Sequence, residues 1–199
     1  MSRRAPVELD VHRLVADRWS PRAFSDEPVP AEVRERLFEA ARWSPSCFNE
    51  QPWRFLVASR DEDPVGHASL AALFNDSNAR WAPAAPLLVL GVAMGRFAHN
   101  DKPNAHARYD LGQAIAWLSM QATHEGLHLH QVAGFHRDRA QDLGLPEAAD
   151  PVVMLAIGYA GDAGDLPEVL AAKERGPRVR RPRADSMLGI PWMSSHEPS

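Results

Sequence analysis

Two arginines and a serine lie close together near the start of the sequence, in the stretch RWSPR at residues 18–22. Arg18 and Arg22 offer planar, permanently charged guanidinium groups, and Ser20 adds a neutral hydroxyl donor between them. This combination suits a phosphate group, because guanidinium groups form charge-assisted hydrogen bonds to its oxygens. The same residues also fit a helix end with a Ser-Pro turn and solvated arginines. The spacing alone favours that second interpretation, since so short a motif is weak evidence.

A second group of cations lies in the stretch KERGPRVRRPR, residues 173–183, which has six cations and one glutamate. It could be a second phosphate-binding arm, although a run of charges is more often a solvated tail. The chain as a whole is acidic, with a formal net charge of -4. That acidity argues against broad nucleic-acid binding, which needs cations to replace phosphate counterions. Two separate basic clusters in an acidic chain indicate a small anionic ligand.

The stretch SPSCFNEQPWRFLV, residues 44–57, is crowded with polar and aromatic residues. The amides of Asn49 and Gln51 can donate and accept together, as the edge of a heterocycle requires. Trp53 could belong to the core or to an interface. An irregular loop capped by its own amides explains the stretch equally well. The residues alone leave both interpretations open.

Other kinds of chemistry find little support. His128 and His130 share a strand face, but no Cys or carboxylate stands at a metal-ligand spacing, so we expect no metal site. The stretch GVAMG is not a dinucleotide-binding fingerprint, and no P-loop or G-x-S-x-G motif occurs. The single cysteine, Cys47, fits a reducing compartment, and we expect a cytoplasmic protein. The longest apolar run, 85–94, is too short to span a bilayer, so we expect no membrane association.

Hydrophobic periodicity and turn residues predict the elements that must position these groups. Helices are expected at 29–43, 64–80, 104–126 and 137–145, and strands at 54–59, 86–94, 127–135 and 151–160. Gly126 is placed to cap the long third helix. The order and the length of 199 residues predict a single α+β or α/β domain with about four core strands. The Pro-, Gly- and Arg-rich residues 161–199 should either be disordered or wrap a partner subunit.

Together these pieces resemble the flavin-dependent nitroreductase family. The family's Arg-x-Ser-x-Arg segment is matched by RWSPR, and its Pro-Ser-x-x-Asn-x-Gln-Pro-Trp motif by PSCFNEQPW at residues 45–53. Asn78 precedes an Ala-Pro strand, Asp110 opens an Asp-Leu-Gly helix, and Gly134 precedes a Phe, each as in the family. Residues 144–159 follow the family's Leu-Gly-Leu-Pro and Ile-Gly-Tyr pattern. The match covers roughly residues 14–183.

The resemblance implies an α+β fold with a mostly antiparallel or mixed sheet of about four to five strands flanked by helices. It implies an intertwined homodimer in which residues 1–199 form one FMN-binding domain and the tail 161–199 wraps the partner. The phosphate would be held by Arg18, Ser20 and a tail arginine, and Arg22 and Asn78 would lie at the pyrimidine edge of the flavin. Gly134 would lie near flavin N5. The full set of implied cofactor contacts is Arg18, Trp19, Ser20, Arg22, Pro45, Ser46, Cys47, Asn49, Asn78, Ala133, Gly134, Arg180 and Arg181, of which 45–49 come from the other subunit.

The resemblance also implies an activity: hydride transfer from NADH or NADPH through flavin N5 to a nitro-aromatic, quinone or enal- or enone-like acceptor, by a ping-pong mechanism. Two alternatives stay open, a dedicated flavin dehydrogenase or dehalogenase of the same family, and a flavin-binding protein without turnover. Cys47 stands where many members have Ser, and Ala133 where many have a polar residue. The segment 95–107 is short, which predicts a rather open site.

Overall fold

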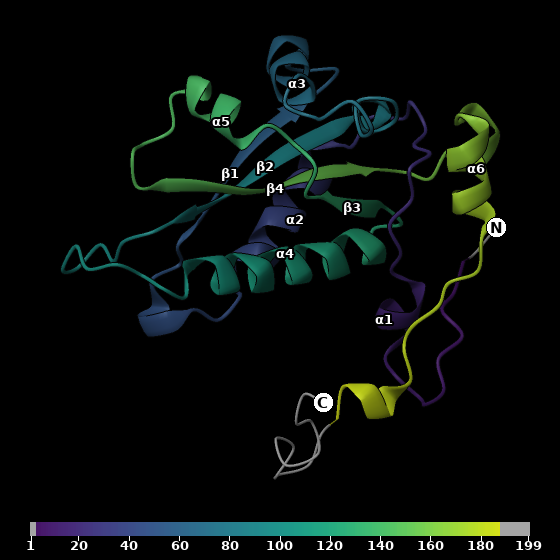
Figure 1. The fold of residues 1–199 in the computed structure, drawn as a ribbon, viewed down its shortest axis with the longest axis horizontal. Helices are drawn as coiled ribbons and strands as arrows, with labels where there is room; N and C mark the ends of the chain where they lie inside the picture. The colour runs from purple at the N-terminus through teal and green to yellow at the C-terminus, as the bar shows by residue number, and fades with distance from the viewer. Residues whose placement is uncertain (1–2, 188–199) are drawn as a thin grey trace, which may run out of the picture.

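The computed structural model of the chain describes residues 3–187 (Figure 1). Its sheet has four strands in the order β1-β2-β4-β3, and every neighbouring pair is antiparallel. The strands are β1 (Trp53–Ser59), β2 (Leu87–Met94), β3 (His128–Val132) and β4 (Ala149–Gly158). The α-helices are α1 (Arg13–Asp17), α2 (Ala31–Arg42), α3 (Pro64–Ala71), α4 (Ala107–His124), α5 (Arg137–Ala140) and α6 (Glu168–Arg175). This arrangement confirms the predicted α+β class and the predicted alternation of helices and strands.

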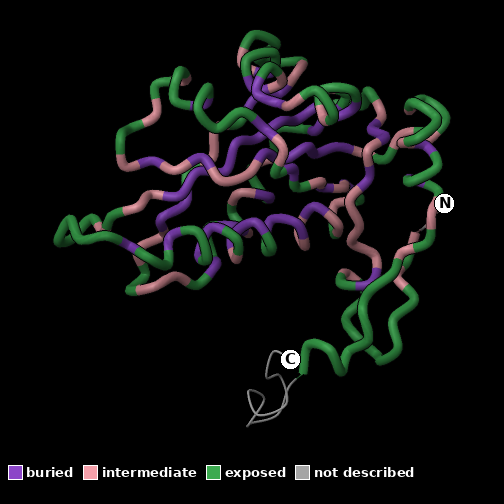
Figure 2. Tube along the Cα trace, viewed as in Figure 1, coloured by how far each residue is buried: buried purple, intermediate pink, exposed green. Residues whose placement is uncertain are grey.

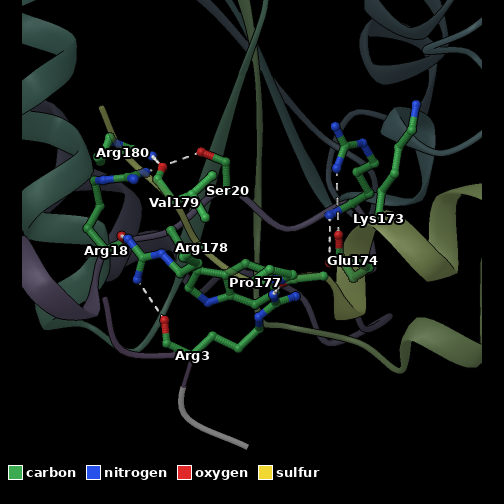
Figure 3. A pocket seen from close by; sticks show the side chains of 12 residues that line it. Arg3, Arg18, Ser20, Lys173, Glu174, Pro177, Arg178, Val179 and Arg180 are labelled. Atoms are coloured by element: carbon green, nitrogen blue, oxygen red, sulfur yellow. Dashed lines mark hydrogen bonds and ion pairs between the residues drawn. The ribbon is translucent and has the colours of Figure 1, made fainter. Parts of the chain in front are cut away.

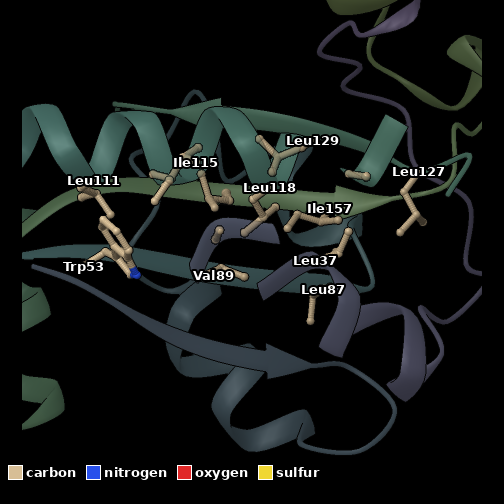
Figure 4. Close-up of a cluster of buried hydrophobic side chains, with 14 of the residues drawn as sticks. Leu37, Trp53, Leu87, Val89, Leu111, Ile115, Leu118, Leu127, Leu129 and Ile157 are labelled. Atoms are coloured by element: carbon tan, nitrogen blue, oxygen red, sulfur yellow. The ribbon is translucent and has the colours of Figure 1, made fainter. Parts of the chain in front are cut away.

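The sheet is covered on both faces, by α2 and α4 on one side and by α3 and α5 on the other (Figure 1). The central strand β2 is apolar along its whole length because both of its faces are buried, as the sequence predicted. Leu87 and Val89 pack with α2 and α4, whereas Leu88 and Leu90 face α3 and α5. Figure 4 shows the first of these clusters, and Figure 2 shows the buried positions concentrated in the sheet and on one side of α4.

The ends of α4 follow from its sequence. Gly126 has a φ of 77°, in the left-handed region that glycine adopts at little cost. The backbone N–H groups of Gly126 and Leu127 then turn back to the carbonyls of Thr123 and Ala122, at 3.2 and 2.8 Å. These two bonds form a Schellman motif, which confirms the predicted cap.

Several elements differ from the prediction, and α1 was not among the expected helices. The helix expected over 64–80 ends at Ala71, because the Asn75 side chain accepts a hydrogen bond from the backbone N–H of Asn78 and favours a turn instead. The tail contains α6, which the composition of 161–199 did not predict, and Ala171 buries its apolar side. After α6 the chain runs beside the N-terminal segment (Figure 1). The rest of the predicted tail, 188–199, lies outside the described residues.

None of the helices described within residues 3–187 combines the length and the hydrophobicity that a membrane-spanning helix needs.

Candidate functional site

The RWSPR segment follows α1 and is held against the edge of the sheet. Beyond it, Phe24 makes an isolated antiparallel bridge to Ala160, just after β4. His130 of β3 reaches the carbonyl oxygen of Pro21 through its Nδ1, at 2.7 Å. Because a carbonyl only accepts, Nδ1 must carry the proton and Nε2 is left as the acceptor of the neutral ring. The segment is therefore anchored by two neighbouring strands rather than being a free loop.

A cavity of about 350 Å³, here called the cationic cavity, opens between this segment and the tail (Figure 3). Its walls come from the N-terminal segment, the RWSPR segment and residues 173–180. Its described lining has an excess of cations over acids, and this excess favours an anionic ligand. The cations are Arg3, Arg18, Arg22, Lys173, Arg178 and Arg180, with Glu174 as the carboxylate and Ser20 as a neutral donor.

Arg178 anchors the tail. Its Nη1 donates to the carbonyl oxygens of Arg3 and Ala16, at 2.6 and 2.8 Å, and its Nη2 donates to that of Arg18, at 2.7 Å. Burial lowers the pKa of Arg178, and the nearby cations Arg18, Arg180 and Arg3 lower it further. Three of the five N–H donors of this guanidinium are used by carbonyls, so two remain for a ligand.

Arg18 and Arg180 are better placed to meet a ligand. Arg18 Nη1 donates to Ser20 Oγ at 3.2 Å, which brings the two predicted phosphate ligands together. Burial lowers the pKa of Arg18, and Arg180 lowers it further. An anion between these cations would relieve their repulsion. Of the two predicted tail arginines, Arg180 lines the cavity, whereas Arg181 is exposed and lies outside the lining.

Arg22 lies between a carboxylate and an aromatic ring. Its Nη1 is 3.8 Å from Oε2 of Glu174, and its guanidinium carbon is 5.8 Å from the centre of the Trp81 ring. Its backbone N–H donates to Oε1 of Glu174 at 2.9 Å. The predicted contact of Arg22 with a flavin therefore involves a side chain that is already oriented by its neighbours.

Two histidines of β3 contact tryptophan rings, His128 in an edge-to-face arrangement and His130 in a tilted one. The His130 ring is 4.5 Å from that of Trp81, and the His128 ring is 5.3 Å from that of Trp19, a predicted cofactor contact that lines the cavity. Burial lowers the pKa of both histidines, that of His130 to about 4. Nδ1 of His128 is buried without a hydrogen-bond partner among the described residues. Among residues 3–187, no group of three or more His, Cys, Asp or Glu side chains is arranged so that it could hold a metal ion.

We expect His130 to make stability fall as the pH drops from about 6.5 toward 4. Its folded pKa of about 4 lies below the unfolded value, so the unfolded chain takes up the proton first. The loss would be at most about 3 kcal/mol. Urea denaturation measures the free energy of unfolding across this pH range. Its pH dependence should be flatter in His130→Gln than in the wild type, and unaltered in the control His136→Gln, which changes an exposed position. Equal slopes in the wild type and His130→Gln would contradict this role.

The loop around Gly134 packs tightly against the turn after α3. The Gly134 carbonyl accepts from the Asn75 backbone N–H at 3.2 Å and from Asn78 Nδ2 at 3.0 Å, and Asn78 Oδ1 accepts from Trp81 Nε1 at 3.2 Å. A Cβ on Gly134 would lie only 2.5 Å from Asn78 Nδ2, so any larger residue would displace the amide side chains that orient this loop. The structure thus gives Asn78 an orienting role that its sequence context did not predict. Ala133, beside it, is exposed.

The predicted flap, residues 45–49, packs on the first turn of α4. The Cys47 backbone N–H donates to Oδ2 of the buried Asp110 at 3.0 Å. Phe48 and Asn49 have φ values of 53° and 56°, which are rare outside glycine, and Phe48 is 84% exposed. Pro45 is exposed, and Ser46 and Cys47 are half-buried. The flap is therefore a strained turn that presents an apolar side chain to solvent.

The flap and the cationic cavity are not brought together within one chain. The flap contacts Asp110, whereas Arg18 shares a second hollow, of about 530 Å³, with the later part of α4 around Trp117 and Met120. Ten residues of helix separate Asp110 from Met120, or about 15 Å. Of the predicted site residues, one protomer gathers Arg18, Trp19, Ser20, Arg22 and Arg180 around the cavity.

Several residues of the cavity lining were not singled out by the sequence interpretation, among them Arg3, Lys173, Glu174 and Arg178. Glu174 is the one acid in the basic run 173–183, and its unusual charge there is the feature of the sequence that could have indicated a role. Nothing local distinguishes Arg178 from the neighbouring arginines, because its partners are backbone carbonyls that lie about 160 residues away along the chain.

Comparison with known proteins agrees with this architecture. Residues 15–80 match the Nitroreductase family. A solved structure described as the oxidoreductase containing FMN is 34% identical, with 96% of this chain and 98% of that chain covered and a TM-score of 0.89. A nitroreductase family protein from Clostridium difficile 630 is 25% identical, with coverages of 88% and 95% and a TM-score of 0.67. In Mycolicibacterium smegmatis, an uncharacterized 15.4 kDa protein in the ask 5′ region is 32% identical over 133 residues, 64% of this chain and 88% of the relative.

The fold is an α+β architecture shared with a solved FMN-containing oxidoreductase. The chain belongs to the nitroreductase family.

Proposed function

We propose that the chain is an FMN-dependent oxidoreductase that passes hydride from NADH or NADPH to a nitro-aromatic, quinone or enal- or enone-like acceptor. The observation that carries this proposal is the cationic cavity, which joins the RWSPR segment to the tail. The FMN-containing structure at 34% identity supports the choice of cofactor.

The donor set of the cavity fits a phosphate monoester. Arg18 and Ser20 are already within hydrogen-bonding distance of each other, and Arg180 lines the same space. Lys173 adds a compact charge from the end of α6. Guanidinium, ammonium and hydroxyl donors converging on one cavity are the groups that bind a phosphate dianion. These four residues would hold the phosphate of FMN.

The remaining residues would tune and position the ring system. When bound, FMN supplies hydride exchange at its N5, which no amino-acid side chain can provide. Arg22 offers a fixed positive charge that favours the electron-rich reduced form. The Gly134 loop is held rigid by Asn75 and Asn78, which suits a loop that lies beside N5. A single open slot used in turn by the nicotinamide and the acceptor would give ping-pong kinetics.

We also propose a homodimer in which the flap of one protomer covers the cofactor of the other. The flap lies away from its own cationic cavity, and it exposes Phe48. The outer side of α4 exposes Tyr109, Ala116 and Trp117, although its inner side is already buried in the core. Aromatic side chains exposed on the outer side of a helix favour a partner there. A monomeric mass in solution with FMN bound would contradict the shared site.

The visible spectrum of the purified protein tests the cofactor and then the activity. We expect a yellow protein, or one that gains a flavin band when FMN is added, and bleaching of that band by NADH or NADPH without oxygen. A protein that gains no flavin band would refute the proposed function. A yellow protein that neither nucleotide bleaches would be a flavin-binding protein and not this enzyme.

A further inference from the structure

Glu174 is a buried carboxylate that faces the cationic cavity. It lies in the last turn of α6 and is only 4% exposed. Its Oε1 accepts hydrogen bonds from the backbone N–H groups of Arg22 and Ala23, at 2.9 and 3.4 Å. A buried acid with two backbone donors and an arginine beside it is held in one orientation.

The second oxygen of Glu174 acts on the Arg22 side chain. Oε2 lies 3.8 Å from Arg22 Nη1, which is an ion pair but too long for a hydrogen bond. The guanidinium donors therefore remain free for a ligand while the charge of Arg22 is partly offset. Among the cavity cations in the described part of the chain, Arg22 is the one with a carboxylate within 4.0 Å.

We propose that Glu174 is a positioning residue that orients Arg22 and offsets part of its charge, and so sets how readily bound FMN is reduced. The inference rests on the proposed function, in which Arg22 lies beside the flavin. A purely structural carboxylate would need only its two backbone bonds. The ion pair to Arg22 adds an electrostatic link between the tail and the ring-binding part of the site.

Glu174→Gln separates the two roles, because the amide oxygen can still accept from both backbone N–H groups while the charge is lost. We expect the reduction equilibrium of bound FMN to shift about tenfold toward the reduced form. This equals about one pKa unit, the smallest shift that a nearby charge usually causes in an ionisation. For a two-electron couple this is about 30 mV in midpoint potential. Anaerobic titration against a reference dye measures it. Glu168→Gln, at an exposed position on the same helix, is the matched control and should leave the potential unchanged.

The same substitution in an Arg22→Met background tests whether Glu174 acts through Arg22. We expect Glu174→Gln to have no effect on the potential there. An unchanged or lowered potential in the single variant, or an equal rise in both backgrounds, would overturn the inference. If Glu174→Gln does not fold, Glu174→Asp takes its place, with a smaller rise expected because the charge moves back by one methylene. A wild-type chain that binds no FMN would refute the proposed function instead, so the two failures are distinct.

Discussion

Replacing Arg18 by alanine is expected to weaken FMN binding roughly 10- to 150-fold. Arg18 lines the cationic cavity and donates a hydrogen bond to Ser20. Loss of a hydrogen bond between charged groups costs about 1.5–3 kcal/mol, which gives this range. Quenching of FMN fluorescence on titration with protein, at one fixed ionic strength, measures the affinity.

Arg181→Ala is the matched control for this prediction. It removes the same charge from the same region, but Arg181 is exposed and does not line the cavity. We expect the FMN affinity of Arg181→Ala to stay within about twofold of that of the wild type, because exposed charges are strongly screened. Similar losses in both variants would mean that only the overall charge matters. Circular dichroism of the FMN-free proteins shows whether Arg18→Ala keeps its fold.

Replacing Arg178 by methionine is expected to release the tail from the N-terminal segment. The change leaves the carbonyls of Arg3, Ala16 and Arg18 without their shared donor, at a cost of about 2–3 kcal/mol for docking of the tail. Local opening of the tail should become roughly a hundredfold more frequent. Limited digestion with trypsin, followed by mass spectrometry, should show faster cleavage within 168–187 and not within the sheet.

Arg183→Met provides the comparison, since it also removes one tryptic site and one charge. Arg183 is exposed, and its side chain contacts only Met187, at 3.4 Å, among the residues with described placement. We expect the cleavage rate at the remaining sites to match that of the wild type. Equal cleavage rates in the two variants would show that the bonds of Arg178 to the N-terminal segment do not hold the tail.

Much of the fold could be predicted from local sequence patterns. Apolar runs predicted β2 and β4, and Gly126 predicted the end of α4, because each depends on periodicity or on one backbone angle. The helix over 64–80 was predicted too long, since the Asn75 side chain bonds to a backbone N–H nearby and breaks the pattern. The helix α6 was missed because a composition rich in Pro, Gly and Arg hides one short apolar stripe around Ala171.

The site was predictable only in part. Residue type made an anion ligand one of two interpretations of RWSPR, and only the family resemblance favoured it; the structure places Arg18, Ser20 and Arg22 on a cationic cavity. Which tail residues complete the cavity depends on how α6 docks, so neither Glu174 nor Arg178 could be assigned roles from spacing. The contact of Asn78 with Gly134 likewise joins residues 56 positions apart. Such contacts arise from tertiary packing, which a motif does not record.

The cationic cavity is built from residues 3–22 together with residues 173–180, and this has a consequence for the order in which its walls are made. All four strands precede residue 159, whereas Arg178 and Arg180 emerge from the ribosome afterwards. Because chains begin to fold from the N-terminal side during synthesis, the sheet can form while the cavity still lacks its second wall. Ligand binding would then follow the synthesis of residues 173–180 and would join the two walls of the cavity, rather than guide the folding of the sheet.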